Sequence, residues 1–182
     1  MTILRLRRFG DPILRQAARR LKPTDIKSGE IRLLITDMRY TNEVKKYGVG
    51  LAAPQVGVSV AVAIIMIRPS KNHSRVQSYD QVIINPSYVG IGQRRSVYEG
   101  CLSTGTGKHT LFGKTLLYPK IQATWLDEHG VQHTEQLDGL VAHVFQHETN
   151  HLDGVLFVDH VRDSRSYMMA DEYRKKLKSN RR

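Results

Sequence analysis

The segment from Gln146 to His151, which reads Gln-His-Glu-Thr-Asn-His, constrains this chain more than any other feature. On a helix, two histidines four residues apart project from one face about one turn apart. His147 and His151 could then bind one metal ion, and Glu148 could reach a water molecule at that ion. Apolar neighbours on both sides indicate a buried helix, where histidines and a glutamate are costly unless they are paired or bind metal.

A catalytic site with one metal ion needs a third protein ligand and one open position. Cys101 is the only cysteine of the chain and lies in the tight segment Glu99–Ser103. One cysteine cannot form an internal disulfide, so a metal-binding or free-thiol role remains. A buried, inert cysteine is the alternative. We predict that the metal ligands are Cys101, His147 and His151.

The 182 residues predict one domain over 1–182, long enough to bury a core. No apolar run approaches the ~20 residues that span a bilayer, and the start of the chain lacks an apolar signal-peptide core. We therefore expect a cytoplasmic protein, with neither a membrane nor DNA as its partner.

The net charge of +11 belongs to the two ends of the chain. Residues 1–22 hold seven Lys and Arg against one Asp, and residues 162–182 hold eight against three acidic residues. Charge runs on helices are usually solvated surface, which is the favoured interpretation. The alternative is a patch that docks on an anionic partner such as RNA.

The chain pattern predicts an α+β fold, in which short antiparallel β-sheets pack around a central helix that carries the histidines, with a C-terminal helix. Asp11-Pro12 is typical of a helix start, and Asp138 can cap the histidine-bearing helix. The predicted helices cover about 11–20, 28–46, a stretch after 138, and 163–178. The predicted strands cover 60–67, 81–85 (ended by Pro86), 115–126 and 131–137, the last two joined by a turn at 127–130. Residues 103–114 are predicted to form a loop.

One alternative is a zinc-type endopeptidase. Some zinc proteases extend the motif to H-E-x-x-H-x-x-G-x-x-H, and Gly154 fits the glycine position. The last position holds Phe157, and His160 comes three residues too late. A carboxylate such as Asp159 could replace the third histidine, although nothing in the sequence singles it out.

Three segments, in this order, are similar to motifs of the peptide deformylase family: residues 48–55 (GVGLAAPQ), 99–103 (EGCLS) and 146–151 (QHETNH). The resemblance covers about residues 3–162. It implies a metal-dependent hydrolase that removes the formyl group from the N-terminal formyl-methionine of new polypeptides. It also implies one divalent ion, natively Fe²⁺, and a thiolate with two imidazoles suits Zn²⁺, Ni²⁺ or Co²⁺ as well.

The resemblance also implies residue roles. Glu148 would move a proton from water to the leaving amine, while the Gln55 amide and the Leu102 N–H would stabilise the oxyanion. Val49 and Gly50 could pair with the peptide substrate as an added strand. The predicted substrate contacts are completed by Glu99, Gly100 and His143.

His143 lies one turn before His147, where the family more often has an apolar residue or arginine. It could make the methionine pocket more polar, or be a hydrogen-bonded or surface histidine.

Two further departures concern the loop and the helix. Residues 104–108 lack the proline that the family usually has after Ser103, and Asn150 stands where aspartate is common. They leave open a weakly active homologue that binds nascent chains or the ribosome. The expected partners are formyl-methionyl nascent chains, and the basic ends could also contact the ribosome or its RNA.

Overall fold

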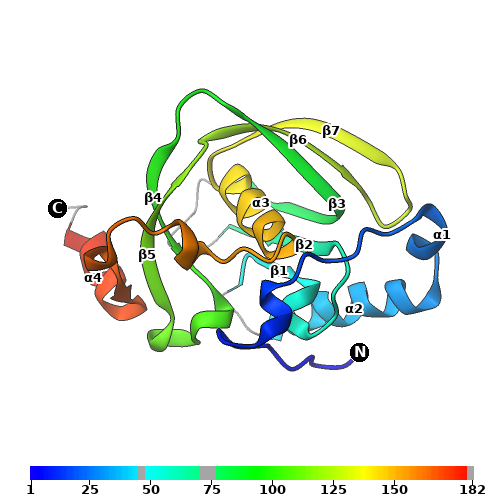
Figure 1. The fold of residues 1–182 in the computed structure, drawn as a ribbon, viewed down its shortest axis with the longest axis horizontal. Coiled ribbons are helices and arrows are strands. Elements are labelled where there is room, and N and C mark those ends of the chain that lie inside the picture. Colours follow the sequence, from blue (N-terminus) through cyan, green and yellow to red (C-terminus); the bar gives the residue numbers. More distant parts are fainter. Residues whose placement is uncertain (45–47, 70–76, 180–182) are drawn as a thin grey trace.

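The computed structural model describes residues 1–44, 48–69 and 77–179. Helix α3 (Gly139–Leu152) lies in the middle, with strands of two antiparallel sheets around it (Figure 1). The larger sheet has the order β1 (Gly50–Ala52), β2 (Val62–Ile67), β3 (Tyr79–Ile91), β6 (Lys120–Leu126) and β7 (Gln132–Asp138). The smaller one has the order β4 (Arg95–Gly100), β5 (Leu111–Leu117) and β8 (Met168–Met169). The predicted α+β architecture is confirmed.

Strand β2 is buried along its whole length, because both of its faces are covered. Val62, Ile64 and Met66 belong to the apolar cluster that includes helix α2 (Gly29–Val44). Ala63, Ile65 and Ile67 belong to a second cluster that includes Phe145 of α3. A strand with two apolar faces reads as a continuous apolar run, and this explains why the sequence predicts it well. The core therefore holds α3 firmly against the sheet.

Strand β3 continues past Pro86, so the prediction that Pro86 ends the strand is wrong. Its register with β6 shifts between Ile84 and Ser87, and Asn85 has a φ of 51°. A proline is tolerated at such a bulge because the bulged residue makes no ladder hydrogen bond. The Asn85 side chain holds the bulge by bonding both the N–H and the carbonyl of Leu21.

The helix predicted from Asp11 to about Arg20 is only a 3₁₀ turn, η1 (Pro12–Arg15), capped by the Asp11 side chain. Beyond it the backbone bonds to distant segments: the Ala18 N–H donates to Leu152, and Arg19 exchanges bonds with Ser59 and Ala61. These tertiary bonds replace helical ones. The chain then forms the short α1 (Pro23–Ile26) before α2, whose predicted end at residue 46 lies outside the described residues.

The C-terminal helix α4 covers Ala170–Ser179, so its predicted start at 163 is wrong. Residues Ser164–Ser166 form the 3₁₀ turn η6, and β8 follows because Met168 and Met169 pair with β5. Two more predictions need correction. The predicted loop at 103–114 contains η3 (Leu102–Thr104), η4 (Gly107–His109) and the start of β5, and the strand predicted at 115–126 is divided between β5 and β6. The β6–β7 turn at 127–130 is confirmed.

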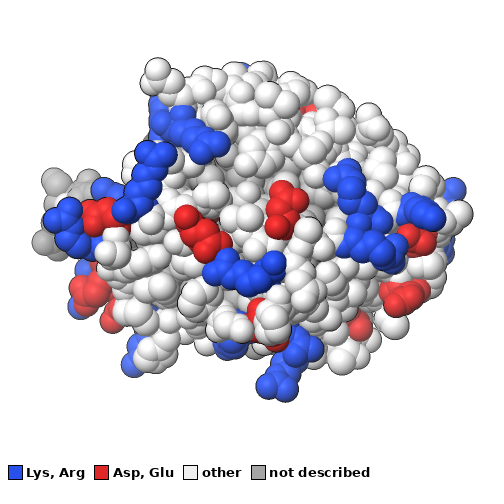
Figure 2. All heavy atoms as spheres, in the orientation of Figure 1, with Lys and Arg blue, Asp and Glu red and all other residues white. Residues whose placement is uncertain are grey.

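In the view of Figure 2, Lys and Arg side chains gather on the left over α4 and above it, and on the right towards α1, and further ones lie between these groups. In the part of the chain that the structure describes, no helix is both long and apolar enough to cross a membrane.

Candidate active site

Helix α3 and the end of β4 bring the three predicted metal ligands together. His147 and His151 lie on one face of α3, and Cys101 follows β4 at the start of η3. The Cys101 Sγ lies 3.2 Å from Nε2 of His151. One ligand atom from each residue falls within 4.8 Å of the others. A soft thiolate with two imidazoles is a donor set that suits a first-row divalent metal.

The buried carboxylate of Glu99 sets the orientation of His147. Its Oε2 lies 2.8 Å from Nδ1 of His147, and its Oε1 accepts a hydrogen bond from the Thr115 hydroxyl. With Nδ1 engaged by Glu99, Nε2 is the ring nitrogen of His147 that is left for a metal. A carboxylate behind a ligand histidine is the usual way to fix its ring and tautomer.

The electrostatics of the cluster favour a thiolate. Burial by itself raises the pKa of Cys101, but the His151 charge and hydrogen bonds from both imidazoles lower it well below its usual value. Burial disfavours charge on His147 as well, yet Cys101 and Glu99 raise its pKa well above normal. For Glu99, burial raises the pKa, but the hydrogen bond and charge of His147 and the Thr115 hydrogen bond together lower it to about 2. The deprotonated thiol is the form that binds metal.

Glu148 is buried beside the cluster, and its Oε2 has no hydrogen-bond partner among the described residues. Burial raises its pKa to about 7 although the two histidines oppose the shift. A Cβ added at Gly50 would lie 2.3 Å from Oε1 of Glu148, so the carboxylate rests on the bare backbone of β1. A carboxyl with a pKa near neutrality can both accept and release a proton.

Gln55 and Leu102 lie next to the cluster on two 3₁₀ turns. The Gln55 side chain accepts a bond from the Ala52 N–H, which orients its amide within η2 (Ala53–Val56). Its amide nitrogen lies 3.3 Å from the Cys101 Sγ. Leu102 is the first residue of η3, directly after Cys101. Both donors are therefore close to the thiol.

The residues predicted to contact substrate lie in different settings. Val49 is exposed and Gly50 begins β1, the edge strand of the larger sheet. His143 is half-buried, with Nε2 3.8 Å from Oε2 of Glu99, and burial lowers its pKa. A Cβ at Gly100 would lie 2.5 Å from the Phe112 ring, so packing against this ring explains why a glycine occupies the position. The predicted substrate contact of Glu99 stays a prediction.

The sequence gives no signal for two residues that support the site. Thr115 on β5 bonds Glu99, and Arg8 from the N-terminal segment donates to the Leu102 carbonyl at 2.9 Å. Both are far along the chain from their partners, and Thr and Arg are common surface residues. Only the three-dimensional arrangement reveals them.

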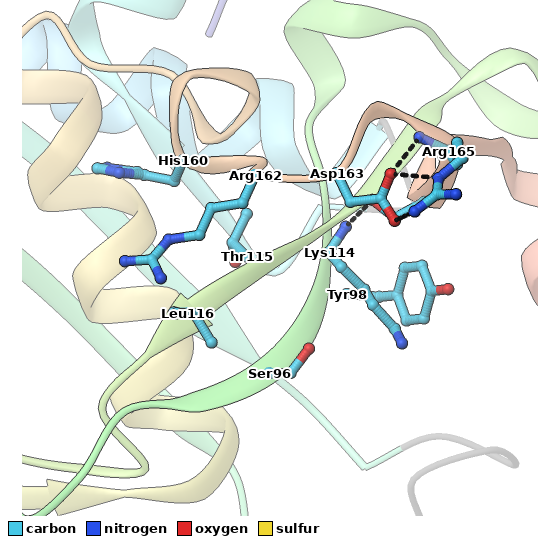
Figure 3. A pocket seen from close by; sticks show the side chains of 10 residues that line it. Ser96, Tyr98, Lys114, Thr115, Leu116, His160, Arg162, Asp163 and Arg165 are labelled. Carbon is cyan, nitrogen blue, oxygen red and sulfur yellow. Dashed lines mark hydrogen bonds and ion pairs between the residues drawn. The ribbon is translucent and has the colours of Figure 1, made fainter.

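A separate hollow of about 370 Å³ opens between β5 and the 160–166 segment. Its lining includes Lys114, His160 and Arg162, and Asp163 is engaged by Arg165 (Figure 3). In Figure 3 the Arg162 side chain extends away from Asp163. Lys114 and Arg162 therefore give this hollow two cationic side chains.

The family model for polypeptide deformylase matches residues 3–167. The chain belongs to the polypeptide deformylase family. The peptide deformylase of Rhizorhabdus wittichii is 36% identical over 174 residues, covering 94% of this chain and 92% of the relative. The peptide deformylase of Chlorobaculum parvum is 38% identical over 157 residues, covering 86% and 79%. These relatives carry the same activity name over nearly the whole chain.

Solved peptide deformylases share the fold. The Thermotoga maritima structure superposes with a TM-score of 0.75 at 30% identity, covering 90% of this chain and 100% of that one. A class I type b peptide deformylase of Acinetobacter baumannii, described as bound to Met-Ala-Ser, gives 0.79 at 27% identity, covering 88% and 99%. As a member of this family, the chain is a hydrolase that removes the formyl group from new polypeptides, and the endopeptidase alternative is not favoured.

Proposed function

We propose that Cys101, His147 and His151 hold one divalent ion, natively Fe²⁺, and that this site carries the deformylation. The convergence of one thiol and two imidazoles within 4.8 Å is the observation that supports it most directly. When bound, the ion supplies Lewis acidity that makes hydroxide available near neutral pH. Metal analysis of protein purified without oxygen would identify the ion. One equivalent of iron is expected, and zinc in its place would contradict the iron assignment.

Glu148 is the proton carrier in this proposal. Its carboxylate is buried at the cluster, and its raised pKa suits a group that takes a proton from water and later gives it to the leaving amine. The Gln55 amide and the Leu102 N–H stabilise the oxyanion that develops when the formyl carbon is attacked. Each such donor typically contributes on the order of 10²–10³ in rate.

The substrate peptide binds as a strand beside β1. Because β1 ends the larger sheet, its outer edge at Val49 and Gly50 can pair with an extended peptide through main-chain bonds. Gly100 contributes main-chain groups to substrate binding, and His143 adds a polar group on the same side of α3 as His147. The A. baumannii relative described as bound to Met-Ala-Ser supports a short methionine-led peptide.

A formyl-Met-Ala-Ser assay with iron-loaded enzyme tests these roles. Turnover is expected for the unaltered chain and its loss for Cys101→Ala. Turnover that survives Cys101→Ala would contradict the ligand assignment. If the unaltered chain were no more active than the Glu148→Ala variant, the result would instead support the alternative of a weakly active homologue that binds the ribosome.

We also propose that the chain works as a single domain over 1–182 in the cytoplasm, and that its basic C-terminal segment docks on the ribosome. The charge at residues 162–182 and the cationic hollow with Arg162 and Lys114 support docking on RNA phosphates. Truncation after Arg162 should weaken ribosome binding and reduce its dependence on salt. Unchanged affinity would contradict the docking proposal.

A further inference from the structure

We infer that Arg8 is a positioning residue for the oxyanion donors. This inference rests on the proposed roles of Gln55 and Leu102. Arg8 is an exposed residue of the N-terminal segment, 94 positions before Leu102, yet its Nη1 donates a 2.9 Å hydrogen bond to the Leu102 carbonyl. It therefore bonds the very residue whose N–H is assigned to the oxyanion.

The neighbours of Arg8 connect the same segment to both donor turns. The Arg7 N–H donates to the Gln55 carbonyl at 2.7 Å, and the Phe9 N–H donates to the Ser103 carbonyl at 2.8 Å. Arg7, Arg8 and Phe9 therefore connect η2 to η3 through hydrogen bonds. Of these three bonds only the Arg8 bond comes from a side chain, so it alone can be removed by substitution.

The turn that Arg8 holds is closed from within by Thr104, whose N–H and hydroxyl both donate to the Cys101 carbonyl. The Arg8 bond comes from a distant segment and reaches the Leu102 carbonyl, which these local bonds leave free to turn. A charged donor makes a stronger hydrogen bond than a neutral one. We infer that the Arg8 guanidinium holds the Leu102–Ser103 peptide, which carries the Leu102 carbonyl, from outside the turn. Through Leu102 it also limits the direction of the Leu102 N–H in the preceding peptide.

A positioning role predicts a specific kinetic pattern. The oxyanion exists only on the reaction path, so a misdirected donor lowers kcat without weakening ground-state binding. Arg8→Met keeps a similar apolar stem and removes the donors. For this variant we expect kcat to fall about tenfold, a fraction of the cost of losing a whole donor. The KM for formyl-Met-Ala-Ser and the inhibition constant of Met-Ala-Ser should stay within about twofold.

The experiment uses the metal-loaded full chain and three reference variants. Arg5→Met removes an exposed arginine three positions earlier and should leave kcat unchanged. Arg8→Lys keeps a charged donor and should recover part of the lost rate. Metal content and the thermal midpoint are measured for each, so that a rate is compared only between folded, loaded proteins.

The outcomes separate the inference from the proposed function. If Arg8→Met keeps kcat while Gln55→Leu loses it, the inference is wrong and the oxyanion assignment stands. If Gln55→Leu also keeps kcat, the oxyanion assignment itself fails. If Arg8→Met unfolds, or raises KM and the inhibition constant as much as it lowers kcat, Arg8 has a general structural role and the inference is overturned. A fall confined to kcat, with recovery in Arg8→Lys, supports it.

Discussion

The Glu99 carboxylate lies 2.8 Å from Nδ1 of His147, one of the three proposed metal ligands. This contact joins β4 to α3, and it occupies one ring nitrogen of His147 so that the other is left for a metal. In the proposed site Glu99 therefore supports a ligand from behind, a role that its position next to Gly100-Cys101 does not reveal.

Glu99→Gln should weaken metal affinity by about 10–100-fold, the range for losing such an outer partner. Glutamine retains the shape but not the charge that holds His147. Competition with a chelator measures the affinity, and Glu135→Gln, at an exposed position on β7, is the control. Equal metal affinity in both variants would show that Glu99 does not support the ligand.

Glu148→Gln should lower kcat by about 10²–10⁴, because no other group takes over the proton. The same variant should change stability in the metal-free protein. The native pKa of Glu148, about 7, is above its usual 4.5, so the native state holds the proton more tightly and loses stability as pH rises from about 4.5 to 7. The Glu148→Gln variant has no carboxyl group at this position, so its stability should not fall for this reason as pH rises.

The stability test compares denaturant unfolding of the two metal-free proteins at pH 5 and pH 8. Between pH 5 and pH 8, the free energy of unfolding of Glu148→Gln should rise by up to about 3 kcal/mol relative to that of the unaltered chain, because the native pKa of Glu148 is about 7 instead of 4.5. A difference that is constant with pH would contradict a raised Glu148 pKa.

Gly50→Ala should reduce activity while the metal stays bound. The added methyl group would lie 2.3 Å from Oε1 of Glu148, so the carboxylate must move away from its place beside the ligands. A displacement of this kind can cost about 100-fold in rate. Gly29→Ala, where an added Cβ meets no atom within 4 Å, is the matched control. Full activity of Gly50→Ala would mean that Glu148 tolerates the shift.

Asn85→Ala should destabilise the fold by about 2–4 kcal/mol, since it removes two hydrogen bonds to Leu21 and leaves a non-glycine residue at φ 51°. Asn85→Gly removes the same bonds without the backbone strain, so it should lose about 1 kcal/mol less. Thermal or denaturant unfolding measures both. Equal losses would show that the strain at this bulge is negligible.

The sequence predicts best what depends on local pattern. The spacing of His147 and His151 requires only a helix, and β2 requires only a run of apolar residues. The α+β class was therefore predictable. The convergence of Cys101 with the histidines joins segments 50 positions apart, and it was predicted from the single cysteine of the chain and the similarity to the family's motifs rather than from local pattern.

The errors arise where distant segments decide the local structure. The chain after Arg15 cannot continue as a helix because Ala18 bonds Leu152, and residues before α4 pair with β5 instead of joining the helix. Pro86 does not end β3 because it lies at the bulge between Ile84 and Ser87. The roles of Thr115 and Arg8 depend on partners 16 and 94 positions away, which no periodicity encodes.

Cys101 and His151 are 50 positions apart, and the N-terminal segment closes on the turn between them. No fragment that ends before His151 contains all three proposed ligands. During synthesis the proposed site can therefore form only after His151 has emerged. An enzyme that trims other newborn proteins must thus wait for its own late helix before it can process any of them.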